Sequence, residues 1–238
     1  MERDAVLFDL DNTLFDHDHS VQAAMAAVQK EHVRLSEFAL SDLVFYYNIA
    51  LDQTYDRYLD YKLTHEEIDM DKVTLFFTLL GLDAPSPDEI QRFRTIYKRV
   101  YRKSRRATPG TVETLTRLRE HGYLGIITNG RTADQVKKAK AIGVRHLVDH
   151  ITTSEEVGYK KPDPRIFQHA MSRFGVPLRR VFMVGDSPEA DIKGALAAGV
   201  QPFLYSPIVK DGHCSRLEGH VPVIRRIDEI LTLFQIPP

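Results

Sequence analysis

Runs of apolar residues, each about as long as a buried strand, recur along the chain. They span residues 5–9, 123–128, 147–152, 180–185 and 201–205. Helical patterns between or after them span residues 111–121, 132–142, 163–174 and 188–198. Strands that alternate with helices are typical of parallel strands joined by right-handed helical crossovers. The pattern therefore predicts an α/β fold with a doubly wound, Rossmann-like parallel sheet.

The alternation is interrupted once, between residue 15 and about residue 106. Apolar positions there recur at helical spacing, and the stretch G-L-D-A-P-S-P-D breaks the pattern before a helix from Asp88 to about Lys103. We therefore expect an all-helical cap domain inserted into the core. The expected cap is residues 17–106, and the expected core is residues 1–16 and 107–238. The expected connections lie near Phe15–Ser20 and Arg106–Gly110.

Composition and charge point to small-molecule chemistry. Hydrophobic residues make up 43% of the 238 residues, and 32 Lys and Arg nearly balance 33 Asp and Glu. This balance favours neither a nucleic-acid polymer nor a membrane as partner, and it leaves the oligomeric state open. No basic leader and no apolar run of the roughly 18 residues that span a membrane is seen. The single cysteine, Cys214, is expected to be a loop thiol and favours a reducing, cytoplasmic compartment.

Polar residues gather in four short stretches, most of them at the ends of the predicted strands. The stretches are D-L-D-N-T (9–13), I-I-T-N-G (126–130), K-K-P-D-P (160–164) and V-G-D-S-P-E-A-D (184–191). Ligands of doubly wound sheets bind beyond the carboxyl ends of the strands. Together the stretches supply what phosphoryl transfer needs, namely a carboxylate nucleophile, a second carboxylate, a hydroxyl, an ammonium and a further acidic cluster.

In this order the four stretches resemble the motifs of the haloacid dehalogenase superfamily of phosphohydrolases, in its branch with a helical cap after the first motif. The resemblance implies that Asp9 attacks phosphorus to form an aspartyl-phosphate. It implies that Asp11 protonates the departing alcohol and then deprotonates the hydrolytic water. It also implies that Thr128 binds the phosphoryl oxygens and that Lys161 supplies the ammonium. A small phosphorylated metabolite is therefore the expected substrate.

Mg²⁺ is the expected cofactor, because oxygen ligands beside a substrate phosphate suit this ion and no His or Cys set suits zinc. The resemblance implies Asp9, the backbone carbonyl of Asp11 and Asp186 as its ligands. Asp191 is expected either to hold Lys161 or a metal-bound water, or merely to favour the first turn of its helix through the helix dipole.

Two further expectations concern the phosphate and the protons. The backbone N–H groups of Asn129 and Gly130 are expected to bind the substrate phosphate, because a helix begins just after them. Acid catalysis requires a protonated Asp11, so the pKa of Asp11 is expected to be raised, whereas Asp9 is expected to stay ionised beside the cation. Thr13 is expected to secure the turn rather than to take part in the chemistry.

Two stretches at the ends of the expected cap leave alternatives open. The first is D-H-D-H-S (16–20), which is expected to be a loop with a helix N-cap at Asp18 or Ser20, or to contact substrate through His17 or Asp18. The second is the basic run K-R-V-Y-R-K-S-R-R (98–106), which is either a solvated helix face or a cationic surface that attracts anionic substrates.

The substrate itself is predicted from weaker signals. The stretch S-E-E-V-G-Y-K-K-P-D-P-R-I-F (154–167) looks like the pyrimidine 5'-nucleotidases of the superfamily, although phosphoglycolate and sugar-phosphate phosphatases share much of it. Seven of the ten tyrosines lie between Tyr46 and Tyr101, where they either pack in the cap or stack on a nucleobase. Lys160 is either solvated or adds positive charge at the mouth of the site.

Four other functions are consistent with parts of this pattern. A dehalogenase of the same superfamily lacks the second acid, so Asp11 argues against it. A sugar-phosphate mutase differs in how its cap excludes water, which the sequence does not decide. A receiver domain of signalling proteins is about 120 residues long and has no insertion after the nucleophile. An inactive interaction protein has no need for all four stretches.

Overall fold

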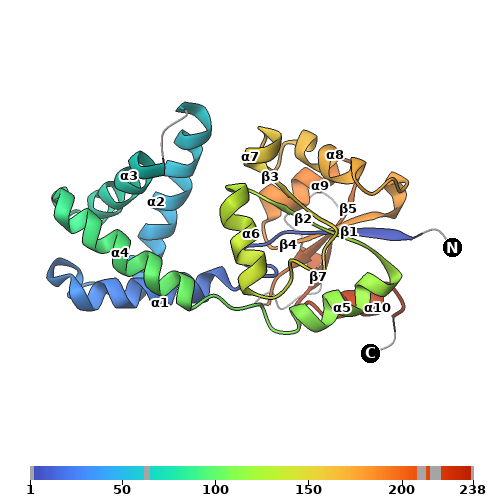
Figure 1. Cartoon of the computed structure of the whole chain (residues 1–238), viewed down its shortest axis with the longest axis horizontal. Coiled ribbons are helices and arrows are strands. Elements are labelled where there is room, and N and C mark those ends of the chain that lie inside the picture. The colour runs from blue at the N-terminus through green and yellow to red at the C-terminus, as the bar shows by residue number, and fades with distance from the viewer. Residues whose placement is uncertain (1–2, 62–64, 208–212, 215–220, 237–238) are drawn as a thin grey trace. The chain divides into compact units, whose positions relative to one another are not determined.

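The computed structural model describes residues 3–61, 65–207, 213–214 and 221–236. Contacts divide the chain into two compact units. We call Met1–His17 with Arg105–Pro238 the core, and Asp18–Ser104 the helical insertion. These limits lie within two residues of the expected domain boundaries. Figure 1 shows both units along the chain.

A seven-stranded sheet with the order β3-β2-β1-β4-β5-β7-β6 forms the centre of the core. The strands are β1 (Asp4–Phe8), β2 (Gly122–Thr128), β3 (His150–Thr153), β4 (Val181–Gly185), β5 (Gln201–Tyr205), β6 (His213–Cys214) and β7 (Val221–Ile224). All neighbours pair in parallel except β6, which is antiparallel to β7. Strand order reverses between β1 and β4, so the predicted doubly wound fold is confirmed.

Helices cover both faces of this sheet. They are α5 (Thr111–His121), α6 (Thr132–Ala141), α7 (Ser154–Val157), α8 (Pro164–Ser172), η2 (Leu178–Arg180), η3 (Pro188–Lys193), α9 (Gly194–Ala197) and α10 (Glu229–Leu233). In Figure 1, α5 and α10 lie together on one side of the sheet, and α8 and α9 lie on the other. Ile166 and Phe167 of α8 belong to the same buried cluster as Leu7 and Met183 in the sheet. Because both faces are covered, the strands are continuous apolar runs.

Several elements of the core differ from the expectation. Strand β3 covers only four residues and begins at His150, and the apolar residues Leu147 and Val148 are buried in the connection before it. The helix expected at 188–198 is divided into the π-helical turn η3 and the short α9. Cys214 lies in strand β6, not in a loop. Neither β6 nor β7 was expected.

The helical insertion has a hydrophobic core of its own. Its helices are α1 (His17–Glu31), which begins in the last residue of the core, η1 (Val33–Leu35), α2 (Leu40–Tyr61), α3 (His65–Leu79) and α4 (Pro87–Lys103). Phe76, Phe77 and Phe93 are fully buried, and burial of each such side chain stabilises the fold by roughly 1.5–3 kcal/mol. Among the described helices, none combines the length and the apolar character needed to cross a membrane.

The first and the last helix of the insertion begin in different ways. Ser86 accepts a hydrogen bond from the Glu89 N–H while the Glu89 side chain accepts one from the Ser86 N–H, which forms a capping box at the start of α4. Helix α1 begins at His17, so neither Asp18 nor Ser20 is its N-cap. Ser20 instead donates a hydrogen bond to the Ser104 carbonyl, 3.2 Å away.

The tyrosines and the basic run of the insertion have mainly structural surroundings. Tyr47 and Tyr97 are buried, with ring centroids 4.6 Å apart. The side chains of Tyr55, Tyr58 and Tyr61 lie outside the described residues. Lys98 of the basic run forms an ion pair with Asp69, which agrees with a solvated, charge-balanced helix face.

Candidate active site

Asp9, Thr128 and Asp186 meet at one edge of the sheet. Phe8 pairs with Ile126 of β2 and with Val184 of β4, so the residues that follow β1 and β4 and the last residue of β2 lie side by side. The Asp9 N–H extends the pairing with a 2.8 Å hydrogen bond to the Val184 carbonyl. Because strand order reverses between β1 and β4, this edge is the place where doubly wound sheets bind ligands.

The turn after Asp9 explains the pattern D-L-D-N-T. Asn12 has a left-handed backbone with φ of 62°, a conformation that Asn adopts more readily than most residues. The Asn12 N–H donates to the Phe15 carbonyl at 2.8 Å, and the Phe15 N–H donates to the Leu10 carbonyl at 2.8 Å. Thr13 is buried and donates a 3.4 Å hydrogen bond to Asp186, so it holds the turn against the end of β4 as expected of a structural residue.

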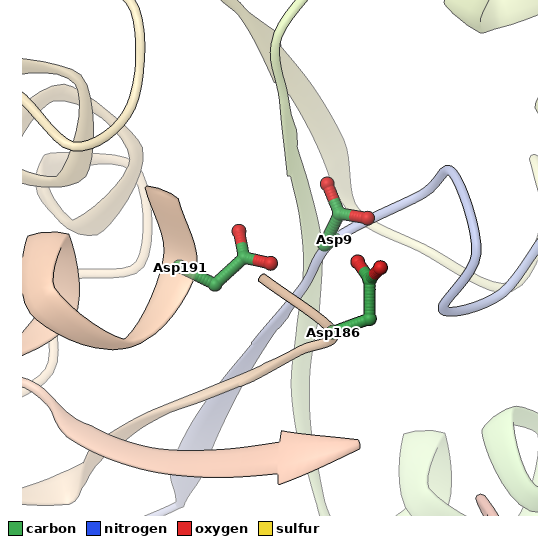
Figure 2. A group of neighbouring side chains, drawn as sticks. All are labelled: Asp9, Asp186 and Asp191. Atoms are coloured by element: carbon green, nitrogen blue, oxygen red, sulfur yellow. The ribbon is translucent and has the colours of Figure 1, made fainter. Parts of the chain in front are cut away.

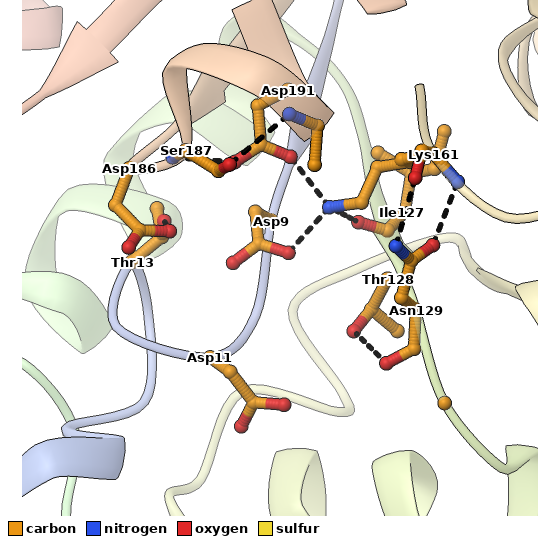
Figure 3. Close-up of polar contacts among 12 residues, drawn as sticks. Asp9, Asp11, Thr13, Ile127, Thr128, Asn129, Lys161, Asp186, Ser187 and Asp191 are labelled. Atoms are coloured by element: carbon orange, nitrogen blue, oxygen red, sulfur yellow. Dashed lines mark hydrogen bonds and ion pairs between the residues drawn. The ribbon is translucent and has the colours of Figure 1, made fainter. Parts of the chain in front are cut away.

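Lys161 reaches this edge from the loop before α8. Its Nζ donates to Asp9 at 2.5 Å, to Asp191 at 2.6 Å and to the Ile127 carbonyl at 3.0 Å (Figure 3). An ammonium has three donors, so these acceptors use all of them. Burial opposes the charge, but Asp191 and Asp9 raise the pKa of Lys161 above its ordinary value. Lys160 is only half-buried, whereas Lys161 is buried against the acidic residues, which makes Lys161 the candidate ammonium.

Asn129 holds the backbone of Lys161. Its side-chain amide donates to the Lys161 carbonyl at 3.0 Å and accepts from the Lys161 N–H at 2.8 Å. Gly130 differs from the expectation, because its N–H donates to the Ser154 hydroxyl at 2.9 Å instead of pointing to a substrate phosphate. The backbone N–H of Asn129 stays a candidate donor to the phosphate.

Asp191 owes its position to the π-helical turn η3. Both Asp191 and Ile192 donate their N–H groups to the Ser187 carbonyl, at 3.0 Å and 3.2 Å, and a turn widened in this way is frequent at functional sites. The Asp191 carboxylate is 1% exposed, and one oxygen accepts from Lys161 while the other accepts from the Ser187 N–H at 3.0 Å. The contact of Asp191 with Lys161 agrees with the expectation that Asp191 holds this lysine.

Asp9, Asp186 and Asp191 form an acidic cluster, shown in Figure 2. One carboxylate oxygen of each lies within 4.8 Å of the others. Burial raises the pKa of Asp9 well above its usual range, Lys161 opposes this, and Asp191 and Asp186 add to it. Burial and Asp191 likewise raise the pKa of Asp186 to about 7. A cation in this cluster would pull the pKa of Asp9 down again, so the expectation that Asp9 is ionised beside a metal ion stays a prediction.

The charges of this cluster fit a divalent cation. Three carboxylates surround one ammonium, which leaves two negative charges when all are ionised, and hard carboxylate oxygens are the ligands that Mg²⁺ prefers. Both oxygens of Asp191 already accept hydrogen bonds. Asp9 and Asp186 are therefore the side chains that can bind a metal directly, with Asp191 behind them.

The Asp11 carboxylate forms a different set of contacts. Lys138 Nζ lies 2.7 Å from both of its oxygens, and His17 Nδ1 lies 3.8 Å from one of them. Burial works against ionisation, but Lys138 and His17 together lower the pKa of Asp11 below its ordinary value. The expected rise in this pKa is thus wrong, because a cation that the sequence did not reveal is paired with the carboxylate.

Lys138 and Gln135 of α6 are the site residues that sequence reasoning missed. Gln135 Nε2 lies 3.1 Å from the Thr128 hydroxyl and 3.2 Å from the Asp11 carboxylate. Residues three apart on a helix share one face, and this face starts just after the stretch I-T-N-G. That spacing was the available signal, although the direction of the face depends on the packing of α6.

Gly185 makes room for Asp191, and Gly185→Ala is expected to lower activity by about 10–100-fold. A Cβ at Gly185 would lie 2.3 Å from an Asp191 carboxylate oxygen, so Asp191 must move away from Lys161. Phosphate release from p-nitrophenyl phosphate measures the effect. Gly175→Ala is the control, because its φ of +66° strains an alanine while no atom lies within 4 Å of the added Cβ. Equal activities of the two variants would contradict the role given to Asp191.

Comparison with known proteins agrees with this geometry. A family model for haloacid dehalogenase-like hydrolases matches residues 3–199. The glyceraldehyde 3-phosphate phosphatase of Methanothermobacter thermautotrophicus is 30% identical over 98% of this chain and 98% of its own length. The pyrimidine 5'-nucleotidase YjjG of Escherichia coli is 44% identical, over 39% of this chain and 41% of its own length.

A solved structure shares the fold over the whole chain. The HAD-hydrolase YfnB of Bacillus subtilis, solved with bound magnesium, matches with a TM-score of 0.78 at 21% identity, over 99% of this chain and 100% of its own. The family model spans most of the sequence. The matched range includes all three residues of the acidic cluster. The chain therefore belongs to the haloacid dehalogenase-like hydrolase family, as its four polar stretches predicted.

Proposed function

We propose that this hydrolase is a Mg²⁺-dependent phosphomonoesterase that acts on small phosphorylated metabolites through an aspartyl-phosphate on Asp9. The observation that carries the proposal is the Asp9 carboxylate, bound to the buried ammonium of Lys161 and clustered with Asp186 and Asp191, with a second acid, Asp11, two residues further on. A cytoplasmic setting is part of the proposal and is favoured by the single cysteine of the chain.

In the first step Asp9 attacks phosphorus. Lys161 holds the Asp9 carboxylate through its hydrogen bond to Oδ1. The bond between phosphorus and the ester oxygen breaks, and Asp11 gives a proton to that oxygen as it leaves. The positive charge of Lys161 offsets the charge of the phosphoryl oxygens, and the Thr128 hydroxyl orients one of them. The free Asp11 carboxylate is paired with Lys138, so Asp11 must take up a proton before this step.

In the second step water attacks the phosphorus of the aspartyl-phosphate. Asp11, now a carboxylate, accepts a proton from that water, and the bond between phosphorus and Asp9 breaks. The products are inorganic phosphate and the free Asp9 carboxylate. The ion pair with Lys138 stabilises the carboxylate form of Asp11 that this step requires.

Asp9 and Asp186 are the proposed side-chain ligands of Mg²⁺, and the Asp11 backbone carbonyl is proposed as a third ligand. The acidic cluster and its raised pKa values support this assignment. When bound there, Mg²⁺ would neutralise charge on the phosphoryl group and would favour the ionised form of Asp9 that a nucleophile needs.

Other activities of the fold fit the site less well. A dehalogenase displaces halide, which needs no proton, so it has no use for Asp11. A receiver domain would not require the helical insertion of Asp18–Ser104. A sugar-phosphate mutase shares the first step but returns the phosphoryl group to a substrate, so release of inorganic phosphate distinguishes it from the proposed hydrolase.

Within this class we propose a nucleoside 5'-monophosphate as the substrate. The resemblance of residues 154–167 to pyrimidine 5'-nucleotidases supports this, as does the 44% identity to YjjG. A triose phosphate is the second candidate, because the relative named for glyceraldehyde 3-phosphate matches 98% of the chain, including the insertion. The insertion is the part in which such enzymes differ.

A substrate panel tests the proposal. About eighty phosphorylated metabolites are assayed for phosphate release with Mg²⁺ and ranked by kcat/KM, because this ratio measures discrimination. We expect UMP, dUMP and dTMP near the top. If they rank last while glyceraldehyde 3-phosphate leads, the nucleotide assignment is wrong and the phosphatase assignment stands. If no monoester releases phosphate yet Asp9 becomes phosphorylated, the hydrolase assignment is wrong.

A further inference from the structure

Two side chains of helix α6 hold the Asp11 carboxylate. Lys138 Nζ lies 2.7 Å from each of the two Asp11 oxygens, and Gln135 Nε2 lies 3.2 Å from one of them. All three residues belong to the core, so their relative placement is a property of one compact unit. Lys138 is 12% exposed and also lies over the Phe15 ring, 5.5 Å from its centroid.

The same Gln135 amide joins Asp11 to the second motif. Besides Asp11, its Nε2 contacts the Thr128 hydroxyl at 3.1 Å and the Asn129 carbonyl at 2.8 Å. The ionised Asp11 carboxylate and the Asn129 carbonyl can only accept hydrogen bonds, so they require the NH₂ group of the amide on this side. One buried amide thus fixes the proposed acid–base carboxyl relative to the proposed phosphate-binding hydroxyl.

The backbone at Gly130 leaves the space for this amide. Gly130 has φ of +142°, and a Cβ there would lie 2.5 Å from Gln135 Nε2. Gln135 is 3% exposed, and among the described residues its Oε1 has no hydrogen-bond partner. A buried acceptor without a partner costs stability that an apolar side chain of the same shape would avoid. Packing alone therefore does not explain a glutamine here.

We propose that Lys138 and Gln135 are positioning residues that hold the Asp11 carboxyl where it meets the leaving oxygen. The inference rests on the proposed phosphatase function and deepens it. A displaced acid slows only those reactions in which the leaving oxygen needs a proton, and a displacement of about 1 Å costs on the order of 10²-fold in rate. A lysine that merely balances charge in the fold would not select among leaving groups. One that only lowered the pKa of Asp11 would, when removed, favour the protonated acid and speed the alkyl ester instead of slowing it.

The leaving group provides the test. Lys138→Met is expected to lower kcat/KM on an alkyl phosphate at least about 10-fold more than on p-nitrophenyl phosphate, because nitrophenolate leaves without a proton. Gln135→Met should act in the same direction with a smaller ratio. Both rates come from one preparation, so their ratio does not depend on how much of the variant is folded.

Three variants complete the design. Lys137→Met is the matched control, because Lys137 is an exposed lysine of the same helix, and its ratio should equal that of the wild type. Lys138→Arg should restore part of the alkyl activity. In an Asp11→Asn background, Lys138→Met should change the ratio no further, because the group that it positions is gone.

The outcomes distinguish the proposed phosphatase function from the positioning role of Lys138 and Gln135. If neither ester releases phosphate with the wild-type enzyme, the proposed function fails. If the wild type and Asp11→Asn behave as expected but Lys138→Met slows both esters equally, the positioning role is overturned and the phosphatase assignment stands. The positioning role is also overturned if Lys138→Met changes the ratio of the two kcat/KM values as much in the Asp11→Asn background as in the wild type.

Discussion

Asp9→Asn is expected to lower phosphate release by about 10⁴-fold or more, because losses of this size follow removal of a catalytic nucleophile. An amide cannot form the aspartyl-phosphate. The site should otherwise keep its order, since Lys161 retains its contacts with Asp191 and the Ile127 carbonyl. Steady-state assays with p-nitrophenyl phosphate measure the loss, and circular dichroism checks the fold.

When both proteins are free of metal, Asp9→Asn is also expected to unfold at no lower temperature than the wild type. Removing one of three neighbouring carboxylates relieves repulsion that the raised pKa of Asp9 reflects, together with the cost of its burial. Asp4→Asn is the matched control, because Asp4 starts the same strand and pairs with Arg180 at its far end. Substantial turnover by Asp9→Asn would remove Asp9 from the role of nucleophile.

Chelation of divalent metal is expected to stop turnover, and added Mg²⁺ to restore it. Mg²⁺ should also stabilise the fold, because it binds a cluster whose carboxylates repel one another in its absence. At about 100 times the dissociation constant the gain is about 2.7 kcal/mol, which raises the melting temperature of a chain of this length by about 5–10 °C. Thermal unfolding with and without Mg²⁺ measures this shift.

Asp186→Asn should remove both the activity and the Mg²⁺-dependent shift. Glu189→Gln is the control, because Glu189 is an exposed carboxylate three residues away whose contact is with Lys193. It should keep both properties. Turnover that survives thorough chelation would contradict the metal role of Asp186.

The carboxyl edge of the sheet was predictable from the sequence because parallel strands bring their ends together. Asp9, Thr128 and Asp186 each follow or end an apolar run, so the alternation of strands and helices was enough to gather them. Lys161 lies in a loop, and its place beside Asp9 followed from the family resemblance rather than from periodicity. The structure gives the reason for this place, since Asn129 binds the Lys161 backbone.

The protonation states and the contacts of Asp11 were not predictable, because they depend on distances between elements. Lys138 and Gln135 reach Asp11 only because α6 presents one particular face to the end of β1. The π-helical turn that carries Asp191 depends on one extra residue in a helix that starts with an ordinary Ser-Pro signal. The last strands escaped detection because β6 has two residues and β7 has four.

The central position of β1 has a consequence for the order of folding. Ala5 pairs with Tyr123 and with Val181, both in the second half of the chain, whereas the apolar core of the insertion joins helices that are neighbours in sequence. Contacts between distant residues form slowly, and a chain emerges from the ribosome N-terminus first. During synthesis the insertion can therefore gather its core early, while the strand that carries Asp9 waits for partners made much later.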